Sequence, residues 1–217
     1  MYKIYISNGA CLFLCCNCNN VRANQNIHFT NSNLTTMKKI FFLLVIIITT
    51  ITSKAQFTKA NLQASGLTCA MCSRAINDAL KELSFVETVK PDIKNSSFAI
   101  VFKQDQQADI DAIKKAVEDA GFFVAKFSIT GTFNNTEIKN DEHVVIGGKE
   151  YHFLSVKDQV LNGEKSLTVV DKNFVTAAAF KKFCAATAMQ CVKTGKAGSC
   201  CEKAGLAAGT RIYHVTI

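Results

Sequence analysis

Two cysteines three residues apart, Cys69 and Cys72, are the side chains of this sequence best placed to do chemistry. They follow Gly66, which permits a sharp turn, and they precede a segment with helical periodicity. Thiolates are soft donors that prefer Cu(I), Zn(II) and related ions over hard cations. Cys72 lies near the N-terminus of the predicted helix, where unpaired N–H groups and the helix dipole favour the thiolate form. The pair therefore predicts a soft-metal site on an open loop.

A Cys-x-x-Cys pair taken alone also occurs in redox proteins, in zinc sites and in disulfides. Structural zinc needs four ligands, and only two are local here, whereas two thiolates suffice for a near-linear Cu(I) ion. Thioredoxin folds usually pair the motif with a preceding Trp and a distant cis-Pro, but this chain has no Trp and its one proline is Pro91. Thiol–disulfide exchange remains the alternative function. A plain disulfide between Cys69 and Cys72 would be the form that cannot bind metal.

The segment around the cysteines predicts the order strand, helix, strand, strand, helix, strand. The strands are expected at 57–66, 85–93, 97–103 and 122–129, and the helices at 73–83 and 110–120. Apolar residues at helical spacing indicate both helices, Asp109 is a suitable N-cap for the second, and Gly121 suits its end. Matching positions recur 37 residues apart, as Ile76 and Ile113 do. Two βαβ halves in one domain predict an α+β, ferredoxin-like sheet of four strands with both helices on one face.

Residues 57–129, about a third of the chain, resemble the heavy-metal-associated domain family. That family includes copper chaperones, the N-terminal modules of metal-pumping ATPases and the periplasmic mercury-binding protein. Its motif Gly-Met-Thr-Cys-x-x-Cys appears here as Gly66-Leu67-Thr68-Cys69-Ala70-Met71-Cys72. The resemblance implies that Cys69 and Cys72 bind the metal. It also implies that Leu67, a near-volume-conserving replacement for Met, packs beneath the loop, and that Phe122 approaches the ion where the family often has Tyr or Lys.

The resulting expectation is a binding protein and not an enzyme. It would chaperone or sequester Cu(I) in the first place, with Hg(II) or Zn(II) as the other candidate ions, through thiolate exchange at Cys69 and Cys72. The expected partners are the ion and a metal-transport membrane protein or another metal-binding domain. Residues 57–129 hold nine basic and nine acidic side chains, so strong charge steering of a partner is not expected.

A leader is predicted before this domain. Met37 is followed by two lysines and an apolar stretch, residues 40–51, and a small-x-small site at 53–55 precedes Gln56. This pattern is typical of a cleaved signal peptide, and about 12 apolar residues are too few for a spanning helix, which needs about 20. Residues 37–55 thus predict a periplasmic or secreted protein without stable membrane insertion.

The 36 residues before Met37 are interpreted as a non-native N-terminal extension, with a metal-binding leader as the competing interpretation. They are rich in Asn and hold Cys11, Cys15, Cys16 and Cys18. Residues 1–55 also contain five basic and no acidic side chains, which account for most of the formal net charge of +8. The remaining balance is too even to predict nucleic-acid binding.

Residues 130–217 predict a small, mainly-β domain of OB-like or α+β type, whose function the sequence does not indicate. The expected elements are a linker or early hairpin at 130–140, a hairpin at 143–156 around Gly147-Gly148, a strand at 166–171 after an Asn162-Gly163 turn, a helix at 175–190 and a strand at 211–217.

The chemistry of this second region lies in four cysteines: Cys184, Cys191, Cys200 and Cys201. On one straight helix the first two would be about 10.5 Å apart along the axis, too far for a direct disulfide. Two disulfides between helix and tail, a second thiolate metal site, and partly free thiols all stay open. Three histidines on separate predicted strands are expected to be surface or packing residues and not ligands: His143, His152 and His214.

Overall fold

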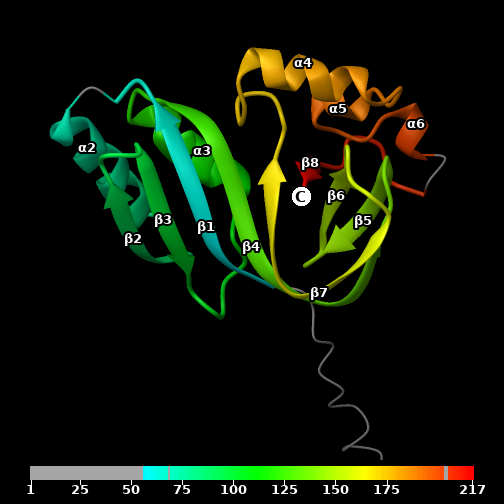
Figure 1. The fold of residues 1–217 in the computed structure, drawn as a ribbon, viewed down its shortest axis with the longest axis horizontal. Helices are drawn as coiled ribbons and strands as arrows, with labels where there is room; N and C mark the ends of the chain where they lie inside the picture. The colour runs from blue at the N-terminus through cyan, green and yellow to red at the C-terminus, as the bar shows by residue number, and fades with distance from the viewer. Residues whose placement is uncertain (1–55, 68, 203–204) are drawn as a thin grey trace, which may run out of the picture. The chain divides into compact units, whose positions relative to one another are not determined.

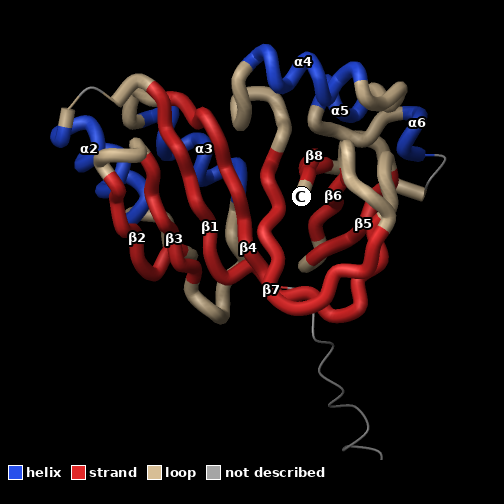
Figure 2. Tube along the Cα trace, in the orientation of Figure 1, coloured by secondary structure: helices blue, strands red, loops and turns tan. Residues whose placement is uncertain are grey.

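The computed structural model describes residues 56–67, 69–202 and 205–217. The predicted leader at 37–55 and the extension at 1–36 lie outside the described residues. The described strands are β1 (Gln56–Ser65), β2 (Val86–Asp92), β3 (Ser97–Phe102), β4 (Phe123–Ile138), β5 (Glu142–Ile146), β6 (Lys149–Phe153), β7 (Gln159–Val169) and β8 (Ile212–Thr216). The described helices are α2 (Ala70–Lys81), α3 (Ile110–Asp119), α4 (Ala177–Ala185), α5 (Cys191–Thr194) and α6 (Ser199–Glu202). Figures 1 and 2 show their arrangement.

The first four strands and two helices have the predicted βαββαβ order. β1 lies between β3 and β4, β2 pairs with β3, and all three pairings are antiparallel. Both helices lie on the same face of these strands (Figure 1), where α2 contacts β2 and α3. Their apolar faces are buried against inward-facing strand residues such as Phe98, Ile100 and Phe102. The predicted helix cap is also confirmed, since the Asp109 carboxylate accepts from the N–H groups of Asp111 and Ala112.

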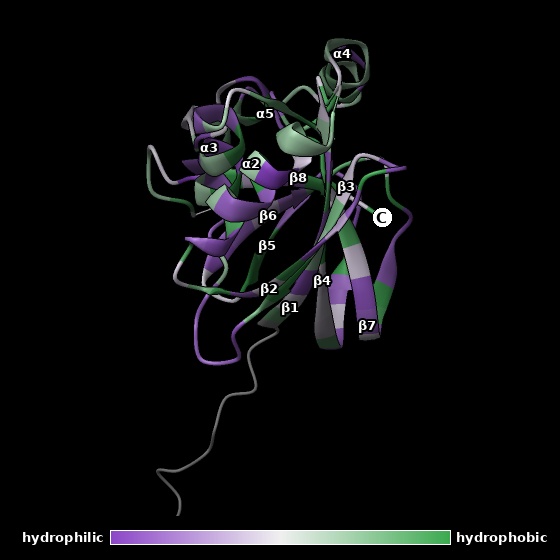
Figure 3. Ribbon diagram, turned by 90° about the vertical axis from the view of Figure 1, so that its left-hand side faces the viewer, coloured by the Kyte–Doolittle hydropathy of each residue, from purple (hydrophilic) through white to green (hydrophobic). Residues whose placement is uncertain are grey.

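Strand β4 continues to Ile138, so the prediction of a linker or early hairpin at 130–140 is wrong. Asn and Thr make this segment look like a loop, but its alternate residues, Phe133 among them, are buried in the core. That alternation is typical of a strand with one buried face. Hydrophobic and hydrophilic residues are interspersed along β4 (Figure 3), and buried positions alternate in its middle part. The sheet therefore runs through residue 130 without a break.

The predicted Asn162-Gly163 turn is wrong for a related reason. Gly163 lies inside β7 and pairs with Phe133 of β4, next to an irregularity in the register of the two strands. Gly163 has a φ of +71°, a conformation that suits a β-bulge as well as a turn. The positive φ that glycine permits is thus used to bend a strand and not to reverse it.

The second half of the chain adds β7, β8, β6 and β5 to the same sheet, in that order. β5 and β6 form the predicted hairpin around Gly147-Gly148, and β8 pairs with β6 in parallel and with β7 in antiparallel orientation. With helices α4, α5 and α6 this region is of α+β type. Within the described residues, no helix combines the length and the apolar character that crossing a bilayer requires.

The single helix predicted at 175–190 is wrong in its second half. α4 ends at Ala185, and Cys191 begins the separate helix α5. Val192, the next residue, is buried with Leu154 and Val170 of the strand region. Because this burial requires the chain to turn before residue 191, Cys184 and Cys191 do not share one helical face.

Candidate metal centre

The loop that carries Cys69 and Cys72, residues 66–72, joins the end of β1 to the first turn of α2. Gly66 has a φ of +87°, a left-handed conformation that costs any residue with a Cβ. A Cβ at this position would lie 3.9 Å from the ring of Phe122, which is ordinary contact. The backbone angle, and not lack of space, therefore requires glycine here.

The helix begins three residues earlier than predicted, which places both cysteines at its N-terminus. Cys69 is the N-cap residue, with extended backbone angles, and its carbonyl accepts from the N–H groups of Cys72 and Ser73. The two Sγ atoms lie 2.9 Å apart. Cys69 is exposed and Cys72 is partly buried. Both sulfurs thus converge at the positive end of a helix dipole, where a ligand can reach Cys69 from solvent.

Two apolar side chains lie at the base of the loop, and for Leu67 this is the packing that the resemblance implied. Leu67 and Phe122 are partly buried and pack against the main core. Phe122 also lies beside Gly66, so the loop before β4 does approach the loop that carries the cysteines. On α2, Ile76 and Leu80 are fully buried and hold the helix on the sheet. The position of the thiols therefore depends on core packing beneath a mostly exposed loop.

Two large hydrophobic side chains next to the loop point to solvent instead. Met71 is 69% exposed in the first turn of α2, and Phe123 is 68% exposed at the start of β4. Phe123 pairs with Ser65, the last residue of β1, and therefore adjoins the loop. Both side chains therefore border the loop and are open to solvent.

The donor set of the loop suits a soft ion. A tetrahedral ion with Zn–S bonds of about 2.3 Å separates two sulfurs by about 3.8 Å, and a linear ion separates them further. The sulfurs, at 2.9 Å, must therefore move apart to bind an ion between them. Cys69 is the exposed partner and has room to move. The same short separation would allow the pair to oxidise.

The four cysteines of residues 130–217 lie in two different hydrophobic clusters. Cys191 and Cys201 are buried in one small cluster with Ile212, and Cys200 packs against it. Cys184 packs in a different cluster, beside Val192. Within the described part of the chain, none of these four cysteines forms a disulfide.

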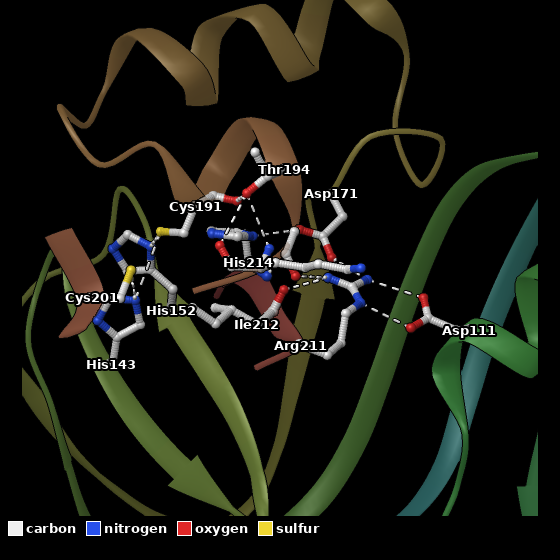
Figure 4. Close-up of polar contacts among 12 residues, drawn as sticks. Asp111, His143, His152, Asp171, Cys191, Thr194, Cys201, Arg211, Ile212 and His214 are labelled. Carbon is white, nitrogen blue, oxygen red and sulfur yellow. Dashed lines mark hydrogen bonds and ion pairs between the residues drawn. The ribbon is translucent and has the colours of Figure 1, made fainter. Parts of the chain in front are cut away.

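Two histidines that the sequence predicted to be surface or packing residues, and not ligands, lie against Cys191 and Cys201. His143 and His152 face Cys191 and Cys201 (Figure 4). One signal could have indicated part of this arrangement, because a hairpin centred on Gly147-Gly148 sets residue 143 opposite residue 152. No sequence signal places the cysteines there, because they arrive from a distant segment.

Comparison with known proteins gives the same assignment for the first region. The profile of the heavy-metal-associated domain matches residues 61–123. A probable copper-exporting P-type ATPase of Archaeoglobus fulgidus is 32% identical over 72 residues, which are 33% of this chain and only 9% of that protein. The chain therefore spans a small part of the length of this relative.

Two solved structures are similar over the same region. The CopZ metallochaperone is 24% identical, with a TM-score of 0.29, and the match covers 31% of this chain and all of that one. Oxidized MerP from Ralstonia metallidurans CH34 is 22% identical, with a TM-score of 0.30, and the match covers 32% of this chain and 94% of that one.

Proposed function

We propose, from the heavy-metal-associated domain at residues 61–123, that this chain is an exported carrier or sink for Cu(I), which it holds between Cys69 and Cys72. The observation that carries the proposal is the convergence of two sulfurs, 2.9 Å apart, on a reachable loop at a helix N-terminus. The matched relative is described as a probable copper exporter, which supports copper as the ion. Hg(II) and Zn(II) are the other ions that this donor set accepts.

Transfer by ligand exchange follows from the openness of the site. With two thiolates bound, the ion can accept an incoming thiolate of a partner before Cys69 or Cys72 leaves, so it is never released to water. The ion keeps its charge and oxidation state throughout. Met71 and Phe123 would contact the partner, which we propose to be a metal-transport membrane protein or another metal-binding domain. Export is proposed from the leader at 37–55, with the mature chain beginning at Gln56.

The test is a competition titration of the reduced full-length chain with Cu(I) and a chelator, without oxygen. Wild-type protein should retain one more equivalent of Cu(I) than Cys69→Ser or Cys72→Ser. Cys184→Ser is the matched control, because Cys184 packs in a separate cluster far along the chain, and it should retain as much Cu(I) as wild type. Equal retention by all variants would refute the proposal. N-terminal sequencing of the native product tests export, and a first residue other than Gln56 would contradict the proposed cleavage.

The second candidate function is thiol–disulfide exchange by the same pair. The close approach of the sulfurs and the exposure of Cys69 favour it. An insulin-reduction assay distinguishes the two functions. Turnover that disappears in Cys69→Ser would support exchange, whereas Cu(I) retention without turnover supports the carrier.

A further inference from the structure

Three histidines form a row across adjacent strands in the second half of the sheet. His143 of β5 is paired with His152 of β6, and His152 is paired with His214 of β8. Directly paired residues project from the same face. The rings of His143 and His152 stack with centroids 4.4 Å apart, and those of His152 and His214 meet edge to face at 5.1 Å. His152 and His214 are fully buried, which is costly for imidazoles unless partners satisfy their nitrogens.

Two buried thiols lie against His143 and His152 of this row. Cys191, at the start of α5, places its Sγ 3.6 Å from Nδ1 of His152 and 3.8 Å from Nε2 of His143. Cys201, in α6, places its Sγ 3.8 Å from the same Nε2. The donor atoms of His143, His152 and Cys191 all lie within 4.8 Å of one another. Figure 4 shows the two sulfurs and two rings gathered together beneath these short helices.

A carboxylate orients the central imidazole. Oδ1 of Asp141 lies 2.9 Å from Nε2 of His152, so Nε2 carries the proton that it donates to Asp141. The lone pair of Nδ1 then faces Cys191. A carboxylate that fixes the tautomer of a neutral imidazole is the usual support of a metal-bound histidine.

We infer that His143, His152, Cys191 and Cys201 form a second metal site, separate from the loop at residues 66–72, and that its ion is Zn(II). A tetrahedral ion with Zn–S bonds of about 2.3 Å and Zn–N bonds of about 2.0–2.1 Å separates sulfur from nitrogen by about 3.6 Å. The separations of 3.6 and 3.8 Å between Cys191 and the two imidazoles fit this geometry, and Cys201 lies at 3.8 Å from His143. Two sulfurs and two imidazoles are the donor set of a structural zinc site. His152, Cys191 and Cys201 are buried, and His143 is partly buried.

The site would also explain how α5 and α6 are held. Each helix has four residues, far fewer than a helix needs for stability by itself. An ion bound to Cys191 and Cys201 would fasten both helices to the strands that carry His143 and His152. A disulfide between the two cysteines would join the helices to each other. It would leave unexplained why two imidazole nitrogens face the sulfurs and why Asp141 orients one ring.

The test uses the full-length chain with Cys69→Ser and Cys72→Ser, so that its outcome is independent of the loop function. This reduced protein should retain one Zn(II) per chain against a competing chelator, and zinc should raise its melting temperature. X-ray absorption of the bound zinc should show two sulfur and two nitrogen neighbours. Co(II) in place of zinc should give the thiolate charge-transfer band of a tetrahedral site.

Adding Cys191→Ser or His152→Ala should abolish zinc retention, while adding Cys184→Ser should not change it. Asp141→Asn should keep the site but weaken its affinity for zinc about 10–100-fold. Such a partial loss would show that Asp141 orients His152, whereas an unfolded variant would lose zinc completely. Four outcomes would each overturn the inference. They are a protein that retains no zinc, zinc retention that Cys191→Ser does not change, retention of Cu(I) only, and a Cys191–Cys201 disulfide in the native protein.

Discussion

The guanidinium of Arg211 forms a two-pronged ion pair with the carboxylate of Asp111, a hundred residues earlier in the chain. Nε and Nη2 of Arg211 lie 2.9 and 3.0 Å from the two carboxylate oxygens of Asp111. Nη2 also donates to Asp171 at 2.8 Å, and the guanidinium stacks on the ring of Tyr213. Asp111 belongs to α3 of the heavy-metal-associated domain, and Arg211 immediately precedes β8. This contact therefore joins the two halves of the chain (Figure 4).

Replacing Arg211 with Ala should lower the free energy of unfolding by about 1–3 kcal/mol. The substitution removes the charged donor from Asp171, whose side chain is only 6% exposed, and from Asp111. Urea unfolding at neutral pH measures the change. The matched control is Lys59→Ala, which breaks an ion pair with Glu164 in which both side chains are more than half exposed. Pairs of that kind contribute about 0–1 kcal/mol, so equal effects of the two substitutions would contradict this account.

Asp111 should make stability depend on acid pH. Burial raises the pKa of its carboxyl, but hydrogen bonds and charge from Arg211 outweigh burial and hold the pKa below its usual range. A lowered pKa in the folded state means that this contribution is present above the unfolded pKa, about 3.9. It is lost as the pH falls through the folded value. Asp111→Asn should therefore destabilise the protein at neutral pH and reduce the loss of stability as the pH falls below about 4. An unchanged acid profile would be inconsistent with the ion pair.

Gly66→Ala should strain the loop that carries the cysteines. The φ of +87° is unfavourable for alanine, and we expect a cost of about 1 kcal/mol together with weaker Cu(I) binding. Gly198→Ala is the control, because its φ is not left-handed and a Cβ there would meet nothing within 4 Å. Chelator competition and thermal unfolding measure both effects. If the two variants bind Cu(I) equally, the loop does not depend on the glycine conformation.

Phe133→Ala should cost about 3–5 kcal/mol, the usual range for truncating a buried phenylalanine. Phe133 is 2% exposed in the middle of β4, where a linker would have left it in solvent. Asn134→Ala, at the next position and exposed, should change stability by less than about 0.5 kcal/mol. Denaturant titration of both variants compares the two faces of the strand. Similar small effects would mean that residues 130–138 are not part of the core.

The loop and its domain could be predicted because the information is local. Gly66, Cys69 and Cys72 lie within seven residues. The helical periodicity that follows them predicts that the thiols lie near the N-terminus of a helix. Even in this segment, helix α2 begins at Ala70, which is three residues before the start that the apolar periodicity predicted. The first turn of a helix need not carry apolar residues, so periodicity alone does not locate its start.

Composition misled the prediction wherever tertiary burial decided the conformation. The segment around Asn134 and Asn135 has the residues of a loop, but pairing with β7 and burial of Phe133 stabilise it as a strand. The Ala-rich segment after Thr176 has the propensity for one long helix, but burial of Cys191 and Val192 requires a break before residue 191. Local propensity is worth a few tenths of a kcal/mol per residue, and burial of one large side chain exceeds it.

The sequence by itself determined the thiol pair, the βαββαβ order and the hairpin that sets His143 opposite His152. Only the tertiary structure brought Cys191 and Cys201 to those histidines, across separations of 39 and 58 residues. Their approach depends on the return of the chain through β8, which pairs with both β6 and β7. Such pairing is a long-range consequence of how the whole core packs, and no spacing within a short segment encodes it.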